Sequence, residues 1–403
     1  MKRTGRKAGI AIAGILFLLA LMLSPTRRSN RAYGSGANPT IFVTDNCTKA
    51  VTAYPIDSTG DAAPAPPAPT GLSLPQAVAI DQNGLIYVAN GCGGQAVVIY
   101  AKGSNGNVSP IAGIGGSNSG LIGVTGVALD SNGLIYVSGF FSSGAGVAIF
   151  PALGNSTGLL NEAPLATIGG SHTGVDIPDG VVLDSAGDIY LADSDADSIS
   201  VFPPLGSSRG NLNEAPFATL KGSSTGLSFP SAIYLDANRN IYVVQEGSDT
   251  VMAFAPLSSR SGIVNEAPFI TISGDLTDLS GPMGIAVDSA GRIFVAQPSA
   301  VLIFPSIGSS TGSINEAPLA TISGSNTDLG EPMGIAFDSN GQIFVTDLGF
   351  SSVFVYPALG SSSGTINEAP TALISTGATT GLGNPAGIGL DSSGRIYVAD
   401  FFD

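Results

Sequence analysis

The stretch Gly284-Ile-Ala-Val-Asp-Ser-Ala-Gly-Arg-Ile-Phe-Val-Ala296 decides the fold of this chain. Two short runs rich in β-branched and aromatic residues flank an Asp-Ser-Ala-Gly turn. The Asp of such a turn accepts hydrogen bonds from backbone N–H groups that follow it, and the Gly adopts a positive φ without strain. The stretch therefore predicts a β-hairpin.

The first half of this hairpin recurs through the chain at intervals of 49 to 54 residues. Each copy is an apolar run that ends in Asp, and most copies are followed by a turn and a second apolar run. The seven terminal residues are Asp81, Asp130, Asp184, Asp236, Asp288, Asp338 and Asp391. A fixed period of this length indicates a repeat architecture.

Each repeat carries two further short strands. A third strand reads like Val301-Leu-Ile-Phe304, and a fourth, such as Leu319-Ala-Thr-Ile322, follows a Gly/Ser-rich connection that usually ends in Asn-Glu-Ala-Pro. Four short strands per repeat are typical of a β-propeller blade, and a lone blade cannot bury both of its faces. The sequence therefore predicts an all-β protein, a single β-propeller of four-stranded blades whose ring closes.

The strands that the two ends of the chain supply predict the number of blades. Residues 41–54 supply a second and a third strand without a first, whereas Gly387 to Asp400 supply a first and a second. Joining them completes a seventh blade with one second strand in surplus, so the N- and C-terminal strands close the ring. Six and eight blades remain open as alternatives.

The phrase Pro-x-Gly-Ile-Ala-x-Asp-x-x-Gly-x-Ile-Tyr-Val-Ala-Asp, clearest in residues 282–296 and 385–400, resembles the NHL repeats of β-propellers. The chain is also similar to the broader group of virginiamycin B lyase-like and YVTN-type surface-layer propellers, because residues 41–45 read Ile-Phe-Val-Thr-Asp. The resemblance implies the fold over residues 41–403. Such rings host enzymes, protein-binding platforms and structural modules, so it does not select one function.

The charge is unevenly distributed along the chain. Seven of the 15 basic residues precede residue 38, and all 30 acidic residues follow it, which leaves the body with a formal net charge of −22. A body this acidic repels phosphate backbones and anionic membrane surfaces. We therefore expect no nucleic-acid partner, and contact with a membrane only through the N-terminal segment.

Residues 1–37 are expected to form a targeting element and a short polar linker, ahead of a propeller in residues 38–403. Lys2, Arg3, Arg6 and Lys7 precede an apolar run of 16 residues from Ala8 to Leu23. This length fits both a cleaved signal peptide and an uncleaved signal anchor, and either predicts export to the cell envelope or the outside of the cell.

A polar residue ends most of the second strands, on the side where the loops feeding the channel mouth converge. The row comprises Asp45, Asn90, Asp193, Gln245, Gln297, Asp347 and Asp400, with Gly139 in the remaining repeat. Asp193, Asp347 and Asp400 of this row, together with Asp179 near the start of a first strand, are candidate binding residues. The alternative is that each side chain caps the turn into the third strand. Asp193, Asp195 and Asp197 alternate in a pattern that can chelate calcium, although the Gly and distal Glu of a known calcium loop are missing.

The inner entry position of each blade is the residue before the small residue that opens the first strand. These positions hold Gln76, Thr125, Asp179, Ser231, Met283, Met333 and Ala386. One carboxylate among them, Asp179, does not make a metal-binding ring, and Gly126, Gly180, Gly284, Gly334 and Gly387 are expected to let neighbouring blades crowd the axis. His172, the only histidine, lies in a loop expected on the channel side. It is either an exposed loop residue or the one His-based acid or base.

Two residue pairs complete the candidate sites. Phe140-Phe141 either anchors a partner or extends a hydrophobic strand. Cys47 and Cys92, the only cysteines, each follow a second strand in consecutive repeats, and in an oxidising compartment they are expected to form a disulfide.

These features favour an exported, non-enzymatic module that binds a protein or cell-wall component. No cofactor is expected, with calcium as the one open option. The alternative is a lyase- or lactonase-type enzyme with a site at the channel mouth, which uses carboxylates with or without a divalent cation. Such an enzyme would need Asp179, Asp193 and His172.

Overall fold

The computed structural model describes residues 40–45, 50–55, 59–60, 75–91, 95–101, 109–142, 144–245, 248–257, 261–308, 310–338, 340–350, 352–374, 385–390 and 396–400. All of them belong to one compact unit, residues 33–403. In these residues every regular element beyond single turns is a strand, and none is a helix long and apolar enough to cross a membrane.

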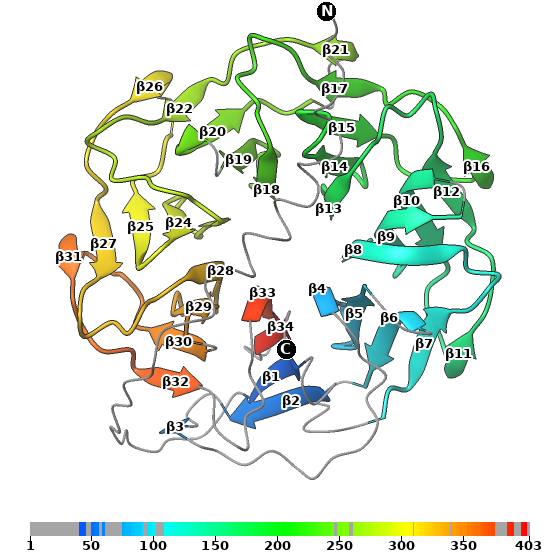
Figure 1. Ribbon diagram of the computed structural model, residues 1–403, viewed down its shortest axis with the longest axis horizontal. Coiled ribbons are helices and arrows are strands. Elements are labelled where there is room, and N and C mark those ends of the chain that lie inside the picture. Colours follow the sequence, from blue (N-terminus) through cyan, green and yellow to red (C-terminus); the bar gives the residue numbers. More distant parts are fainter. Residues whose placement is uncertain are drawn as a thin grey trace, which may run out of the picture. The chain divides into compact units, whose positions relative to one another are not determined.

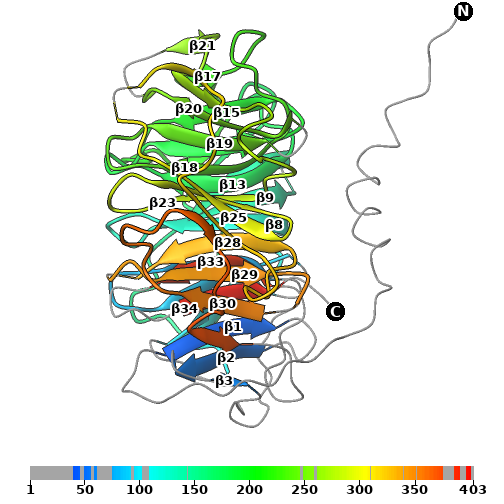
Figure 2. The same cartoon turned by 90° about the vertical axis from the view of Figure 1, so that its left-hand side faces the viewer.

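The strands form six five-stranded sheets and one four-stranded sheet, arranged radially around a centre (Figure 1). The same unit is seen from the side in Figure 2. The all-β propeller is thus confirmed. The innermost strand of every sheet is the predicted first strand of a repeat. These are β4 (Pro75–Ile80), β8 (Leu121–Leu129), β13 (Pro178–Leu183), β18 (Pro230–Leu235), β23 (Gly284–Val287), β28 (Pro332–Phe337) and β33 (Pro385–Leu390).

The second and third strands follow outward as antiparallel neighbours in the six larger sheets. The second strands are β5 (Ile86–Asn90), β9 (Ile135–Phe141), β14 (Ile189–Asp193), β19 (Ile241–Gln245), β24 (Ile293–Gln297) and β29 (Ile343–Asp347). The third strands are β6 (Gln95–Tyr100), β10 (Gly144–Phe150), β15 (Ser198–Phe202), β20 (Thr250–Phe254), β25 (Ala300–Phe304) and β30 (Ser352–Tyr356). Both sets are almost fully buried, which explains their continuous apolar sequences.

The expectation of four-stranded blades is wrong for these six sheets, because each gains a fifth strand. The fourth strands are β7 (Ala112–Gly115), β12 (Ala166–Gly169), β17 (Ala218–Leu220), β22 (Ile270–Ile272), β27 (Ala320–Ser323) and β32 (Ala372–Ile374). Outside them, in parallel, lie β11 (Gly158–Leu160), β16 (Gly210–Leu212), β21 (Gly262–Val264), β26 (Gly312–Ile314), β31 (Gly364–Ile366) and β3 (Thr59–Gly60). Each fifth strand comes from the next repeat, so the long third-to-fourth connection covers a neighbour's sheet edge.

The Asn of each Asn-Glu-Ala-Pro turn fastens this exchange. The Oδ1 of Asn213, just after β16, accepts a hydrogen bond from the backbone N–H of His172 in the preceding repeat (2.9 Å). The same bond recurs in four other repeats, with the acceptors Asn161, Asn265, Asn315 and Asn367. The connection therefore links consecutive repeats by a parallel strand and a side-chain clasp.

The four-stranded sheet combines the two ends of the chain. Its order is β2 (Ala50–Pro55), β1 (Thr40–Asp45), β34 (Ile396–Asp400) and β33. The predicted pairing of the N- and C-terminal strands is confirmed, and the surplus second strand appears as two adjacent second strands. Consequently β1 and β34 run parallel, with Phe42 opposite Tyr397, whereas β33 and β34 are antiparallel.

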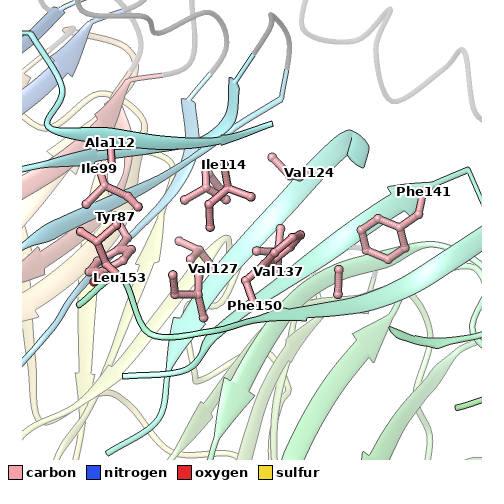
Figure 3. Close-up of a cluster of buried hydrophobic side chains, with 14 residues drawn as sticks. Tyr87, Ile99, Ala112, Ile114, Val124, Val127, Val137, Phe141, Phe150 and Leu153 are labelled. Atoms are coloured by element: carbon pink, nitrogen blue, oxygen red, sulfur yellow. The ribbon is translucent and has the colours of Figure 1, made fainter. Parts of the chain in front are cut away.

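The hydrophobic core lies between neighbouring sheets. One cluster joins Tyr87 and Ile99 of β5 and β6 to Val137 of β9 and Phe150 of β10 (Figure 3). Similar clusters fill four further junctions. Because each sheet buries its faces against its neighbours, no blade is expected to be stable alone.

Candidate functional site

The polar residues that end the second strands are buried and bonded to the protein itself. The Oδ2 of Asp193 accepts a hydrogen bond from the backbone N–H of Asp176 (2.6 Å), and Oδ1 accepts from those of Ile177 and Ala196 (3.1 Å each). Asp176 and Ile177 belong to the loop that enters the first strand, and Ala196 to the turn that enters the third. Asp193 is 1% exposed. The carboxylate thus ties together the loop that enters the first strand and the turn that enters the third. We call the end of the ring at which these loops lie the ring mouth.

Asp347 has the same role in its own repeat. Its Oδ2 accepts from the N–H of Gly330 (2.8 Å), and its Oδ1 accepts from those of Glu331 (3.2 Å) and Phe350 (2.9 Å). Burial raises the pKa of Asp347 to about 6; the three N–H donors oppose this shift, and the nearby charge of Glu331 adds to it. This carboxyl is therefore expected to change from protonated to ionised near pH 6.

Glutamine replaces the carboxylate in two repeats. The Oε1 of Gln297 accepts from the N–H of Ser280 (2.9 Å), while its Nε2 donates to the carbonyl of Asp278 (2.9 Å). Gln245 likewise accepts from the N–H of Ser228 and donates to the carbonyl of Gly226. The amides of Gln245 and Gln297 thus bind the same kind of loop backbone as the carboxylates do. The alternative that the side chain caps the turn into the third strand is confirmed for Asp193 and Asp347.

Asp179 is the exposed carboxylate of the innermost strand β13. Its side chain is exposed, and its Oδ2 accepts a hydrogen bond from the N–H of Ser194 (3.2 Å). Partial desolvation raises the pKa of Asp179; the bonds to Ser194 lower it, and the charges of Asp193 and Asp195 raise it again. The structure thus brings Asp179 and Asp193 into one neighbourhood, with Asp179 open to solvent.

The alternating Asp193, Asp195 and Asp197 do not share one centre. Asp193 faces its own loops, whereas the Oδ1 of Asp197 accepts from the N–H of Phe229 in the next repeat (2.8 Å). Within the described residues no group of three or more His, Cys, Asp or Glu side chains is placed to hold a metal. The side chains of this motif therefore join consecutive repeats rather than converge.

The residues at the start of the first strands contact the neighbouring repeat in different ways. The hydroxyl of Thr125 donates to the carbonyl of Pro178 in the next repeat (2.7 Å). A Cβ on Gly284 would lie 1.8 Å from the carbonyl oxygen of Met333, so the prediction that neighbouring blades crowd the axis is confirmed there. It is wrong at Gly180, because a Cβ there would meet no atom of the neighbouring blade within 4 Å.

His172 lies away from the channel. Its backbone N–H is bonded to Asn213, which directly follows β16, the outermost strand of its sheet. The expectation that this loop faces the channel is therefore wrong at His172, because the loop begins at the outer edge before it runs inward. The residue is exposed, which agrees with its interpretation as a loop histidine.

Phe140 and Phe141 extend a strand, as the second interpretation held. Both belong to β9, which pairs with β8 and β10 up to this point. Phe141 is 6% exposed and packs in the core, whereas Phe140 is 40% exposed. Ile122 of β8, at an irregularity opposite this end of β9, is 69% exposed. We call Ile122 and Phe140 the apolar tip.

Several candidates lie outside the described residues. Cys47 and Cys92 are among them, so their disulfide stays a prediction, as does the role of residues 1–37. Asp45 ends β1, and Asp400 ends β34 opposite Pro385, but their side chains are not described.

Comparisons with known proteins support the fold. No family model and no curated protein matches the chain. Among solved structures, the WD40 β-propeller domain of Doa1 aligns with a TM-score of 0.56 at 14% identity, over 85% of this chain and 95% of that one. A streptogramin B lyase aligns at 0.49 and 12% identity over 83% and 93%, and virginiamycin B lyase from Staphylococcus aureus at 0.47 and 13% over 81% and 92%. At these identities the likeness concerns the fold alone, and the alignment with the WD40 domain shows that the chain is similar to β-propellers.

Proposed function

We propose that this protein is an exported, non-enzymatic β-propeller that binds a protein or cell-wall component of the cell envelope. The observation that carries the proposal is the internal use of the mouth's polar side chains. The polar side chains that end four of the second strands are buried and form hydrogen bonds with backbone groups of the protein's own loops. They are Asp193, Gln245, Gln297 and Asp347. These side chains therefore hold the loops of a surface in place and are not free to react with a substrate.

The apolar tip is the contact we assign to the partner. Phe140 and Ile122 lie on neighbouring strands that are longer than their counterparts in the other sheets, with β8 spanning nine residues and β9 seven. Exposed aromatic and aliphatic side chains at the centre of a contact contribute most of the binding energy at protein interfaces. Asp176 and Asp195 are exposed in the loops beside β13 and β14 of the adjacent sheet, which favours a partner with basic groups beside an apolar one.

Binding to isolated envelope material tests this proposal. The double variant Ile122→Ser, Phe140→Ser should lose at least tenfold in affinity in a co-sedimentation titration, because both apolar contacts are removed. Ile263→Ser is the matched control, since Ile263 is 76% exposed on the outermost strand β21. Equal retention of both variants, or no sedimentation of the wild-type protein, would contradict the proposal.

Export is tested separately by cell fractionation. The proposal expects the protein in the envelope or medium, and deletion of residues 1–37 should leave it in the cytoplasm. A cytoplasmic full-length chain would refute export and leave the binding surface as a separate question.

A lyase- or lactonase-type enzyme is the second candidate, favoured by one observation. Asp179 is exposed at the ring mouth and has a raised pKa, which suits a carboxyl that exchanges protons with a substrate. If this candidate is correct, Asp179→Asn abolishes turnover of a lactone or cyclic ester while the melting temperature is unchanged. Under the first proposal the same variant keeps envelope binding.

The finer description of the fold is also a proposal. The four-stranded sheet from the two chain ends, added to the six larger sheets, supports a ring of seven blades. The recurring Pro-x-Gly-Ile-Ala-x-Asp phrase supports an NHL-type assignment within the propellers.

A further inference from the structure

The turn between the first and second strands uses both oxygens of its Asp. In the six repeats where it is described, Oδ1 accepts from the backbone N–H groups two and four residues later, at 2.8–3.0 Å. In five of these repeats Oδ2 accepts from a side chain of its own turn. The donors are Asn83, Asn132, Asn240, Arg292 and Asn340.

The turn of Asp184 departs from this pattern. Ala186 and Asp188 occupy the positions that supply the donor elsewhere, and neither side chain can donate when Asp188 is ionised. Asp188 is 8% exposed, and burial raises the pKa of its carboxyl; the charge of Asp184 raises this pKa further, and the charge of Arg239 lowers it. The turn therefore buries two carboxylates with no donor of its own for either the Oδ2 of Asp184 or the side chain of Asp188.

A second departure, in the next repeat, meets the first. Arg239 occupies the position at which the other described turns have Gly, and it adopts a φ of 66°. A residue with a Cβ is strained in this region by about 1 kcal/mol. Its Nη1 lies 3.2 Å from the Oδ2 of Asp184, across the junction of the two sheets. The guanidinium thus replaces the missing donor at the cost of backbone strain.

A buried hydroxyl without a partner lies beside this turn. Tyr190 is fully buried, and within the described residues its OH has no hydrogen-bond partner. Tyr190 belongs to β14, which begins one residue after Asp188, and the backbone N–H of Asp184 donates to the carbonyl of Asp188. The charges of Asp184, Asp188 and Arg239 all act on this hydroxyl. We call Asp184, Asp188, Tyr190 and Arg239 the carboxylate cluster, which has a formal net charge of −1 when both carboxyls are ionised.

We propose that the carboxylate cluster binds a divalent cation of the calcium class, held by the carboxylates of Asp184 and Asp188 beside the hydroxyl of Tyr190. Carboxylate oxygens are ligands that calcium takes in proteins, and water completes its coordination. Arg239 occupies the position of the cation when none is bound, and its side chain is 34% exposed, so it has room to move outward. The cation then ties two consecutive repeats on the side of the ring opposite the mouth. This site is independent of the partner surface proposed above.

The experiment is a calcium titration of the full-length protein after treatment with a chelator, read by calorimetry and by melting at constant ionic strength. The wild-type protein should bind saturably and melt a few degrees higher with calcium, by mass action. Asp188→Asn should weaken binding at least tenfold. Arg239→Gly, which restores the residue of the other repeats and removes the competing cation, should strengthen it at least tenfold.

Asp275→Asn, which changes an exposed carboxylate in another repeat, is the matched control and should bind like the wild-type protein. Three outcomes overturn the proposal: no saturable calcium binding, equal binding by Asp188→Asn and the wild-type protein, or weaker binding by Arg239→Gly. A melting temperature that rises on acidification but not with calcium would mean that a proton on Asp188 neutralises the carboxylate cluster, and it also overturns the proposal.

Discussion

Replacing Asp347 with Asn should remove a pH dependence from the stability of this protein. Asp347 is 0% exposed, and its carboxylate accepts three backbone N–H groups at the ring mouth. Burial nevertheless raises its pKa to about 6, against about 3.9 for an Asp in an unfolded chain.

The sign follows from which state binds the proton more tightly. Because the folded pKa is the higher one, the stabilisation from the protonated carboxyl is fully present below about pH 4 and is lost as the pH rises through about 6. A shift of about two pKa units corresponds to about 3 kcal/mol. The free energy of unfolding should therefore fall by about this amount between pH 4 and pH 8 on account of Asp347 alone.

Urea unfolding of the wild-type protein and Asp347→Asn at several pH values measures the effect. The free energy of unfolding of the variant should be lower by about 1–3 kcal/mol at every pH, because the Asn amide offers one acceptor oxygen where three N–H groups need partners. The difference between the two proteins should shrink or reverse as the pH rises from 4 to 8, and using the difference cancels the other carboxyls. A difference that instead grows with pH would show that the three N–H donors outweigh burial and would refute the reasoning.

Three other perturbations test the packing and closure of the ring. Gly284→Ala should lower the free energy of unfolding by about 2 kcal/mol or more, because the new Cβ would lie 1.8 Å from the carbonyl oxygen of Met333. Gly180→Ala, at the equivalent position of another repeat, should lower it by less than about 0.5 kcal/mol, because no atom lies within 4 Å of the new Cβ. Urea unfolding of the two variants and the wild-type protein compares these values. Asn213→Ala should cost about 1 kcal/mol in the same assay, because the loop N–H of the preceding repeat loses its acceptor, and an unchanged midpoint would contradict the clasp. Ending the chain after Thr380 removes β34, which pairs with β1, and β33, which pairs with β34 and contacts β4 and β28. The truncated protein should therefore aggregate or lose cooperative melting in calorimetry, while loss of only the last three residues is tolerated. One transition near the full-length temperature would show that the ends do not close the ring.

The candidate site was only partly predictable from the sequence. The position of Asp193 and Asp347 at the ends of second strands was predicted, because strand ends follow from local alternation and turn residues. Their second contact, with the loop that enters the first strand, was missed, because that loop lies 16 or 17 residues earlier. The Asn of the Asn-Glu-Ala-Pro turn was missed as well, although its recurrence in five repeats was the signal that could have identified it.

By itself the sequence determined the elements of this protein, namely the hairpin, its Asp turn and the order of strands in each repeat. These depend on side-chain alternation and on hydrogen bonds within four residues, such as those of Asp288 to the N–H groups of Ala290 and Arg292. Only the tertiary structure decided which repeats share strands and where Arg239 meets Asp184, 55 residues away. Contacts of this kind exist only when the ring has closed and stacked the sheets, because no local rule of turn or strand formation brings one repeat against the next.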